Sequence, residues 1–336
     1  MKKALLYSIF ALSIASTTLT SCEDIFGGFL DKQPSNELTG EQVFSDWNLT
    51  VQFHLDTYNF LRHGAGRIST TWLDAATDLA ETSYGNGVRT SFNIGNFYGG
   101  SGASELVDTW EHYYRGIRKC NMLLTRIEEV PQNPADSEDK YNRDKKNYIA
   151  EARFLRAYFY WELFLRYGPI PIVTEVLDPD GDLMSKYTIR PTTKEYVVDF
   201  ILEELKSCED DLLDYKTAWT SSSAGRIGQP MACALRSRIM LFMASPRYSS
   251  ESGITWQQAA NVAKEFIDNY GTNFALFNDK DATGATLGIE NYTNALLRTA
   301  YQGSNKEVIF YRNDDKQNWG NIKNDTPVGE GGNGGL

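Results

Sequence analysis

Apolar side chains recur every three or four positions over much of the chain, which is the spacing of one face of an α-helix. In the first half, this spacing predicts helices over about 39–61, 104–130 and 138–167. Thr39 and Gln42 form a capping box, in which each residue satisfies a backbone N–H of the other, and this box opens the first helix. The first half of the chain is therefore expected to be built from long amphipathic helices.

The second half continues with predicted helices over about 192–212, 229–244 and 255–269. The first of these begins with Thr-x-x-Glu and the third with Thr-x-x-Gln, and both sequences are capping boxes. Two polar, glycine-containing segments, 64–103 and 301–322, are expected to form irregular loops. The chain is therefore predicted to be mostly α, with consecutive helices paired so that each covers the apolar face of the next.

The first residues have the pattern of a secretory signal. Two lysines follow the initial methionine, and residues 4–19 are uncharged and largely apolar. The run Leu-Thr-Ser-Cys that ends at Cys22 resembles a lipobox, in which the thiol takes a diacylglycerol. We therefore expect residues 1–21 to be a lipoprotein signal peptide and Cys22 to be the lipidation site. The alternative is an ordinary signal followed by a chance cysteine.

Residues 22–38 are the expected lipidated cysteine and its polar tether. Glu23 and Asp24, directly after the cysteine, resemble the surface-export signal of certain Gram-negative lipoproteins. One acyl chain binds a bilayer only marginally, whereas two or three form a stable anchor. The segment predicts a protein that outer-membrane lipid holds through the acylated cysteine and that faces the cell exterior.

The formal net charge of −11 argues against a nucleic-acid partner, because a polyanion repels so acidic a surface. The hydrophobic share of 41% is normal for a globular domain. The cysteines beyond Cys22 fall in predicted helices without metal-binding spacing, so we expect buried thiols: Cys120, Cys208 and Cys233.

No recognisable catalytic set is present in the sequence, and we expect no enzyme activity. Adjacent acids such as Glu203-Glu204 are expected to be solvated helix faces. Asp279 to Glu290 has the spacing of a calcium loop, although Thr283 replaces the usual acid or amide and no helical pattern precedes it. We keep calcium there as an alternative and predict neither a metal nor a cofactor. The three histidines are expected to be structural: His54, His63 and His112.

Aromatic residues make up 13% of the chain, more than a core alone requires. Four tryptophans fall in helical patterns and are expected in the core: Trp47, Trp110, Trp161 and Trp256. Other aromatic residues lie in polar loops or near strand ends: Trp72, Tyr84, Tyr98, Trp219, Tyr301, Tyr311 and Trp319. Flat rings stack on the apolar C–H faces of sugars, while Asn, Asp and Arg bond the hydroxyls.

Several motifs occur in the order known from one family. Leu30-Asp31-x-x-Pro34 resembles the start of mature SusD/RagB proteins. The stretch from Glu151 to Pro171, which contains EARFLRAY and RYGPIP, resembles their most recognisable sequence. Gly225-Arg226 and the helix that ends at Ser245-Pro246 are similar to their next helical hairpin, and Asn305 to Phe310 looks like their late strand.

This resemblance implies a SusD-like fold, with tetratricopeptide-like helical pairs that carry long ligand-binding loops. It divides the chain after the tether into an N-terminal helical region, 39–270, and the start of a C-terminal region, 271–336. We expect the latter to be incomplete, because family members continue further. The implied function is to bind oligo- or polysaccharide glycans and deliver them to a SusC-like TonB-dependent transporter. Binding of peptide or another nutrient on the same scaffold is the alternative.

The two polar loops rich in aromatic residues are the predicted ligand surface, because rigid scaffolds commonly present binding groups on loops. The expected stacking rings are Trp72, Tyr98 and Trp319, and the expected hydroxyl-binding side chains are Arg312 and Asn318.

Overall fold

The computed structural model describes residues 39–61, 77–78, 94–95, 104–178, 180–182, 187–220, 222–297 and 305–312. The chain divides into two units, residues 1–43 and 44–336, and the arrangement discussed below is that of the second. Helices form most of the regular structure in these ranges, which contain no β-strand and two isolated β-bridges. The predicted mostly α fold is confirmed.

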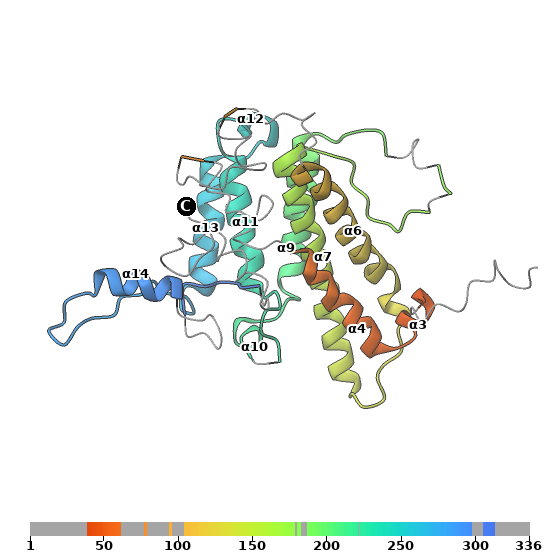
Figure 1. Ribbon diagram of the computed structural model, residues 1–336, viewed down its shortest axis with the longest axis horizontal. Coiled ribbons are helices and arrows are strands. Elements are labelled where there is room, and N and C mark those ends of the chain that lie inside the picture. The colour runs from red at the N-terminus through yellow and green to blue at the C-terminus, as the bar shows by residue number, and fades with distance from the viewer. Residues whose placement is uncertain are drawn as a thin grey trace, which may run out of the picture. The chain divides into compact units, whose positions relative to one another are not determined.

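Two long helices lie side by side in the middle of the chain (Figure 1). α6 (Ser104–Arg126) continues into the short 3-10 turn η3 (Ile127–Glu129), and α7 (Glu138–Tyr167) follows. Gly116 of α6 allows a close approach, because a Cβ there would lie 2.8 Å from the Phe159 ring of α7. Both predicted helices, 104–130 and 138–167, are confirmed.

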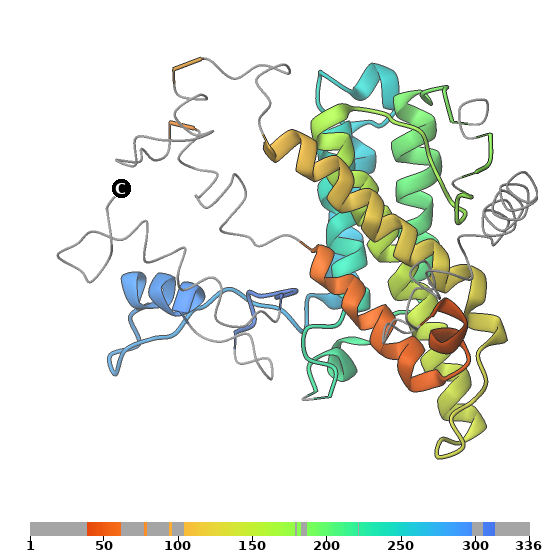
Figure 2. The ribbon, with the colours of Figure 1, turned by 45° about the vertical axis from the view of Figure 1, so that its right-hand side comes forward.

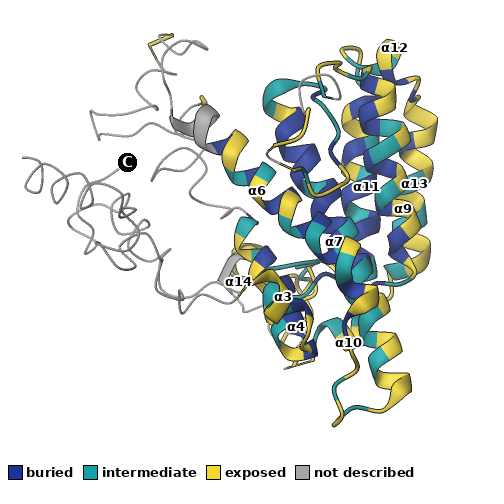
Figure 3. Ribbon diagram, turned by 90° about the vertical axis from the view of Figure 1, so that its right-hand side faces the viewer, coloured by how far each residue is buried: buried dark blue, intermediate teal, exposed yellow. Residues whose placement is uncertain are grey.

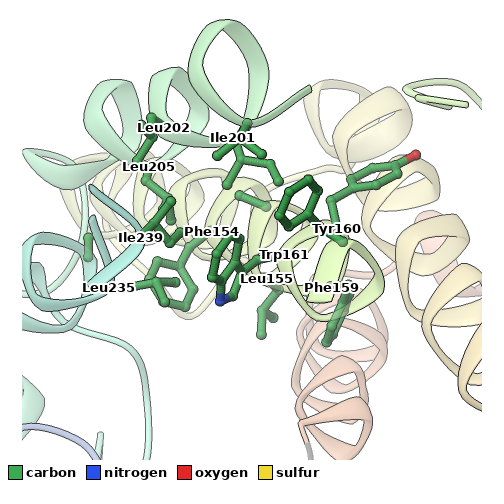
Figure 4. Packing of buried hydrophobic residues seen from close by; sticks show 14 of the residues in the cluster. Phe154, Leu155, Phe159, Tyr160, Trp161, Ile201, Leu202, Leu205, Leu235 and Ile239 are labelled. Carbon is green, nitrogen blue, oxygen red and sulfur yellow. The ribbon is translucent and has the colours of Figure 1, made fainter. Parts of the chain in front are cut away.

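α7 is the central helix of the core. Between residues 150 and 164, every residue except Arg153 and Tyr158 is buried. Apolar and aromatic residues occupy most of its circumference, as a helix covered on all sides requires. The buried charged residues Glu151, Arg156 and Glu162 each form an ion pair. Figure 4 shows α7 residues such as Phe154 and Trp161 among leucine and isoleucine side chains of the later helices.

Four later helices continue the packing. They are η4 (Lys194–Leu202), which has wide π-helical turns, α9 (Glu203–Glu209), α11 (Gln229–Met243) and α13 (Trp256–Tyr270). α7 packs on η4 and α9, α9 packs on α11, and α11 packs on α13. Figure 3 shows buried residues concentrated on α7 and α11, whereas α13 is mainly exposed. Such neighbour-on-neighbour packing is that of a tetratricopeptide-like stack.

All three capping boxes form. The Thr39, Thr192 and Thr255 backbone N–H groups each donate to the side chain three residues later. In return, each threonine hydroxyl accepts the N–H of that third residue. Local sequence therefore sets these three helix starts.

The prediction of a single helix over 39–61 is wrong. The segment forms α3 (Gly40–Phe44), α4 (Trp47–Asp56) and the 3-10 turn η1 (Thr57–Phe60). The Asp46 side chain accepts the Leu49 N–H and begins a new helix, which interrupts the first one.

Two of the four tryptophans expected in the core are not there. Trp47 and Trp161 are buried, but Trp110 is 39% exposed and Trp256 is 56% exposed. Trp110 packs against the rings of Tyr114 and Tyr167. Helical spacing identifies a face, but it does not say how far along the helix that face is covered.

The expected late strand, 305–310, is also wrong, because these residues form a turn and irregular backbone. The thiol prediction is confirmed, since Cys120, Cys208 and Cys233 are buried and unpaired. Among the described helices, none combines the length and apolar character needed to cross a bilayer.

Candidate functional site

Most of the predicted site residues lie outside the described ranges: Cys22, Trp72, Tyr98, Asn318 and Trp319. Their roles therefore stay predictions. Arg312 is described, and it belongs to the short segment 305–312. The surroundings of this segment define the candidate site.

Arg312 lies in a cleft of about 160 Å³ that Tyr58, Arg226 and Phe310 also line. Its Nη1 donates to the backbone carbonyl of Leu61 at 2.5 Å, across a sequence separation of 251. Figure 2 shows the dark-blue segment 305–312 beside the end of α4. The fold thus brings a late segment against the first helices.

A buried carboxylate lies beneath this cleft. Glu151 of α7 is fully buried, and Arg226 donates to its Oε1 through Nε at 2.9 Å and through Nη2. The His54 imidazole Nε2 lies 2.9 Å from Oε2, and the Tyr58 hydroxyl donates to the same oxygen at 2.7 Å. The Arg226 guanidinium also lies over the ring of Tyr148, 4.6 Å from its centroid.

Burial and charge act in opposite directions on these groups. Burial alone raises the pKa of Glu151, but Arg226 and His54 outweigh it and hold that pKa below its ordinary value. Burial, together with the neighbouring Glu151 carboxylate, raises the pKa of Tyr58 well above its usual range. Burial disfavours the charged form of Arg226, yet Glu151 overcomes this and the pKa of Arg226 is raised. Glu151 therefore stays ionised and fixes the guanidinium at the cleft.

An aromatic group lies on the other side of the segment 305–312. The Trp219 and Tyr311 ring centroids are 5.5 Å apart with an interplanar angle of 32°, and Tyr215 lies 6.1 Å from Trp219. We call these three residues the Trp219 platform. Trp219 follows α10 (Tyr215–Ala218), a single turn that Asp214 caps through its side chain. The platform and Arg226 line one narrow pocket, so it adjoins the cleft.

The arrangement suits a ligand that has both apolar faces and hydroxyl groups. A half-buried tryptophan beside a tyrosine offers a flat surface for stacking. Arg226 and Arg312 bring guanidinium donors to the adjoining cleft, and Asn59 adds an amide. Few polar groups among apolar walls are typical of small-molecule sites.

The sequence identifies Trp219 and Tyr311 as aromatic residues of loops, but they are not among the stacking rings predicted from it. Their partnership joins positions 92 apart, and no local pattern signals it. One sequence feature did point to Trp219: the Ser/Thr-rich loop that follows it is as polar as the segments around the predicted stacking rings.

The calcium spacing at Asp279–Glu290 forms a loop closed by its own hydrogen bonds. The Asp281 Oδ1 accepts the N–H groups of Thr283 and Ala285 and the Thr283 hydroxyl. These donors all bond one of the two carboxylate oxygens of Asp281. α14 (Gly288–Leu297) then begins near the end of the loop.

Three acidic residues on the helices pair with arginines: Glu204, Glu209 and Glu265. Glu204, expected to be solvated, accepts hydrogen bonds from Arg153 and Arg156 between α7 and α9. Glu209 and Glu265 approach Cys233 closely enough to suggest a metal group, but Arg236 donates to both carboxylates. Burial raises the pKa of the Cys233 thiol to about 12. This cluster has the chemistry of an ion pair.

Comparison with known proteins gives a consistent assignment. The SusD-like family model described as "starch-binding associating with outer membrane" matches residues 28–241, more than half of the chain. A SusD-like protein of Formosa agariphila is 24% identical over 228 residues, which are 66% of this chain and 41% of that protein.

Solved structures agree with the fold. A SusD-like protein from Bacteroides fragilis has a TM-score of 0.61 at 25% identity, covering 83% of this chain and 46% of its own. A SusD-like carbohydrate-binding protein from the same species has a TM-score of 0.52 at 19% identity, covering 70% and 43%. A laminarin-binding SusD-like protein also scores 0.52, at 20% identity, covering 73% and 47%. The chain thus spans less than half the length of these relatives.

Proposed function

Since this chain belongs to the SusD-like family, we propose that it is a non-catalytic cell-surface lipoprotein that binds glycans and delivers them to a SusC-like TonB-dependent transporter. Lipid on Cys22 holds it at the outer membrane, facing the exterior. Its ligands are oligo- or polysaccharides, and its acidic surface gives it no nucleic-acid partner.

One observation carries the choice of a glycan. The Trp219 platform places a flat aromatic surface beside the guanidinium groups of Arg226 and Arg312. Sugar rings combine apolar faces with a rim of hydroxyls, and this pairing of surfaces matches both. The carbohydrate ligands in the names of two structural relatives agree with this choice over a peptide.

The test begins with a glycan array probed with the purified protein, followed by titration of the bound glycan. Trp219→Ala should weaken binding about two- to tenfold, because a stacked ring contributes about 0.5–1.5 kcal/mol beyond buried area. Trp256→Ala is the matched control, since that ring is 56% exposed on α13 and does not line either pocket of the site. Trp72→Ala and Trp319→Ala test the rings selected from the sequence.

If Trp219→Ala bound the glycan with the affinity of the parent, the Trp219 platform would not be part of the binding site. Binding to peptides in place of any arrayed glycan would favour the alternative ligand class. The anchor is tested separately: Cys22→Ala should release the protein from the membrane or leave its signal uncleaved. A variant that still fractionates with the outer membrane and resists detergent-free extraction would contradict the anchor.

A further inference from the structure

A strap of chain between α7 and η4 is extended at Val173. The hydroxyl of buried Tyr160 accepts the Val173 N–H at 2.7 Å and donates to the Val173 carbonyl at 3.0 Å. In a helix, the N–H and C=O of one residue point in opposite directions, whereas in an extended chain they point to the same edge. One hydroxyl therefore reaches both groups only if Val173 is extended.

The inner edge of this strap is bonded by side chains of α6 and α7. Tyr114 donates to the Pro171 carbonyl at 2.9 Å. The Asn121 amide donates to the carbonyls of Val173 and Glu175, both at 3.0 Å. Alternate residues thus face the helices, and side chains take the place of a neighbouring strand.

The outer edge has no such partners. Ile172 and Thr174 lie between the residues that face inward, so their backbone groups point the other way. Neither residue forms a backbone or side-chain hydrogen bond with any residue that the structure describes. An edge of this kind is a template for pairing with another extended chain.

This edge borders an open groove of about 520 Å³. Tyr187, Ile189 and Pro191 also line the groove, and Ile189 is 82% exposed. Two carboxylates line it: Glu175, which accepts a hydrogen bond from the Tyr187 hydroxyl, and Glu195, which accepts the Thr192 N–H. Among the residues that the structure describes, no lysine, arginine or histidine lines it. The groove thus combines apolar walls with negative charge.

We propose that this groove binds an extended peptide segment by strand addition to the edge at Ile172 and Thr174. The segment carries apolar side chains that meet Ile189 and Pro191, and basic side chains that meet Glu175 and Glu195. Because side chains of a strand alternate between its two faces, an alternating apolar and basic sequence meets both requirements. This surface shares no lining residue with the Trp219 platform, so it does not depend on the proposed glycan site.

The test uses the purified full chain and a fluorescent, terminally blocked hexapeptide of alternating valine and lysine, followed by fluorescence anisotropy. Thr174→Pro removes the outward N–H, and it keeps the extended backbone that proline tolerates. Thr174→Ala is the matched control, because it retains the N–H. We expect Thr174→Ala to bind like the parent and Thr174→Pro to bind at least about fivefold more weakly, because an unpaired polar group is left behind.

Two further peptides distinguish strand addition from simple charge attraction. They also test strand addition without any substitution in the protein, in case Thr174→Pro does not fold. One is N-methylated at the valines and the other at the lysines, so both keep their charge. Only one edge of a bound strand pairs with the protein, so we expect one methylated peptide to lose binding at least fivefold and the other to retain it. Equal binding of all three peptides, equal loss by both methylated forms, or no binding at all would overturn the proposal. So would an arrayed glycan whose affinity falls with Thr174→Pro.

Discussion

Replacing Arg226 with leucine should destabilise the protein, because it leaves the buried carboxylate of Glu151 without its arginine partner. Glu151 is fully buried, and Arg226 is the only arginine or lysine that pairs with it among the described residues. Without the guanidinium, the carboxylate keeps His54 and Tyr58 as partners but loses its strongest counter-charge. Removing one partner of a buried ion pair costs about 3–5 kcal/mol.

The loss should depend on pH. Because the folded-state pKa of Glu151 is lowered in the parent, its contribution to stability is present above the ordinary carboxyl pKa and is lost as the pH falls through the lowered value. The variant lacks the charge that lowers this pKa, so its Glu151 protonates more readily and carries a smaller penalty in acid. The difference in unfolding free energy between parent and variant should therefore be largest near neutral pH and shrink toward acid.

Urea unfolding followed by circular dichroism at pH 7 and near pH 4.5 measures both effects. Lys264→Leu is the control, because Lys264 pairs with Asp268 on the exposed face of α13 and should contribute about 0.5 kcal/mol or less. Glu151→Gln should cost less than Arg226→Leu, since the Arg226 side chain is 17% exposed and reaches water. A loss below about 1 kcal/mol at pH 7, or one that does not change with pH, would refute the reasoning.

Three other experiments test the core. Leu155→Ala, at a fully buried position in α7, should lower the free energy of unfolding by about 2–5 kcal/mol in the same urea titration, and a loss under 1 kcal/mol would remove it from the core. Gly116→Ala places a methyl 2.8 Å from the Phe159 ring and should cost about 1–3 kcal/mol, whereas Gly288→Ala meets no atom within 4 Å and should change stability by less than about 0.5 kcal/mol. Burial raises the pKa of the Cys120, Cys208 and Cys233 thiols to about 12, so a disulfide reagent should react with them only after unfolding, and fast reaction in the native protein would contradict their burial.

Features set by neighbouring residues were predictable from the sequence. The three capping boxes and the bounds of α7 depend on residues within a few positions of one another. The division of the first predicted helix at Asp46 was equally local, but the periodic apolar pattern continued across it and concealed the new cap.

Features that depend on distant partners were not predictable. Glu151 reads as a polar residue of a family motif, and its burial depends on His54 and Arg226, which lie 97 and 75 positions away. Trp110 and Trp256 have the spacing of core residues, yet both stay more than one third exposed. The Trp219 platform joins two loops that the sequence separates widely, and the rings selected at Trp72 and Trp319 stay predictions.

The packing of each helix on its predecessor has a consequence for how the chain folds. α6 and α7 are consecutive in the sequence and form an extensive interface. Their contacts, such as that of Tyr113 with Glu162, 49 positions away, close shorter loops than the links from Glu151 to His54 and Arg226. Local contacts have a low entropic barrier, and proteins rich in them fold rapidly. We expect the α6–α7 hairpin to form early and the later helices to add to it in order. The hydrogen bonds of Glu151 with His54 and Arg226 require long loops to close. We therefore expect them to form late, after the helices have packed.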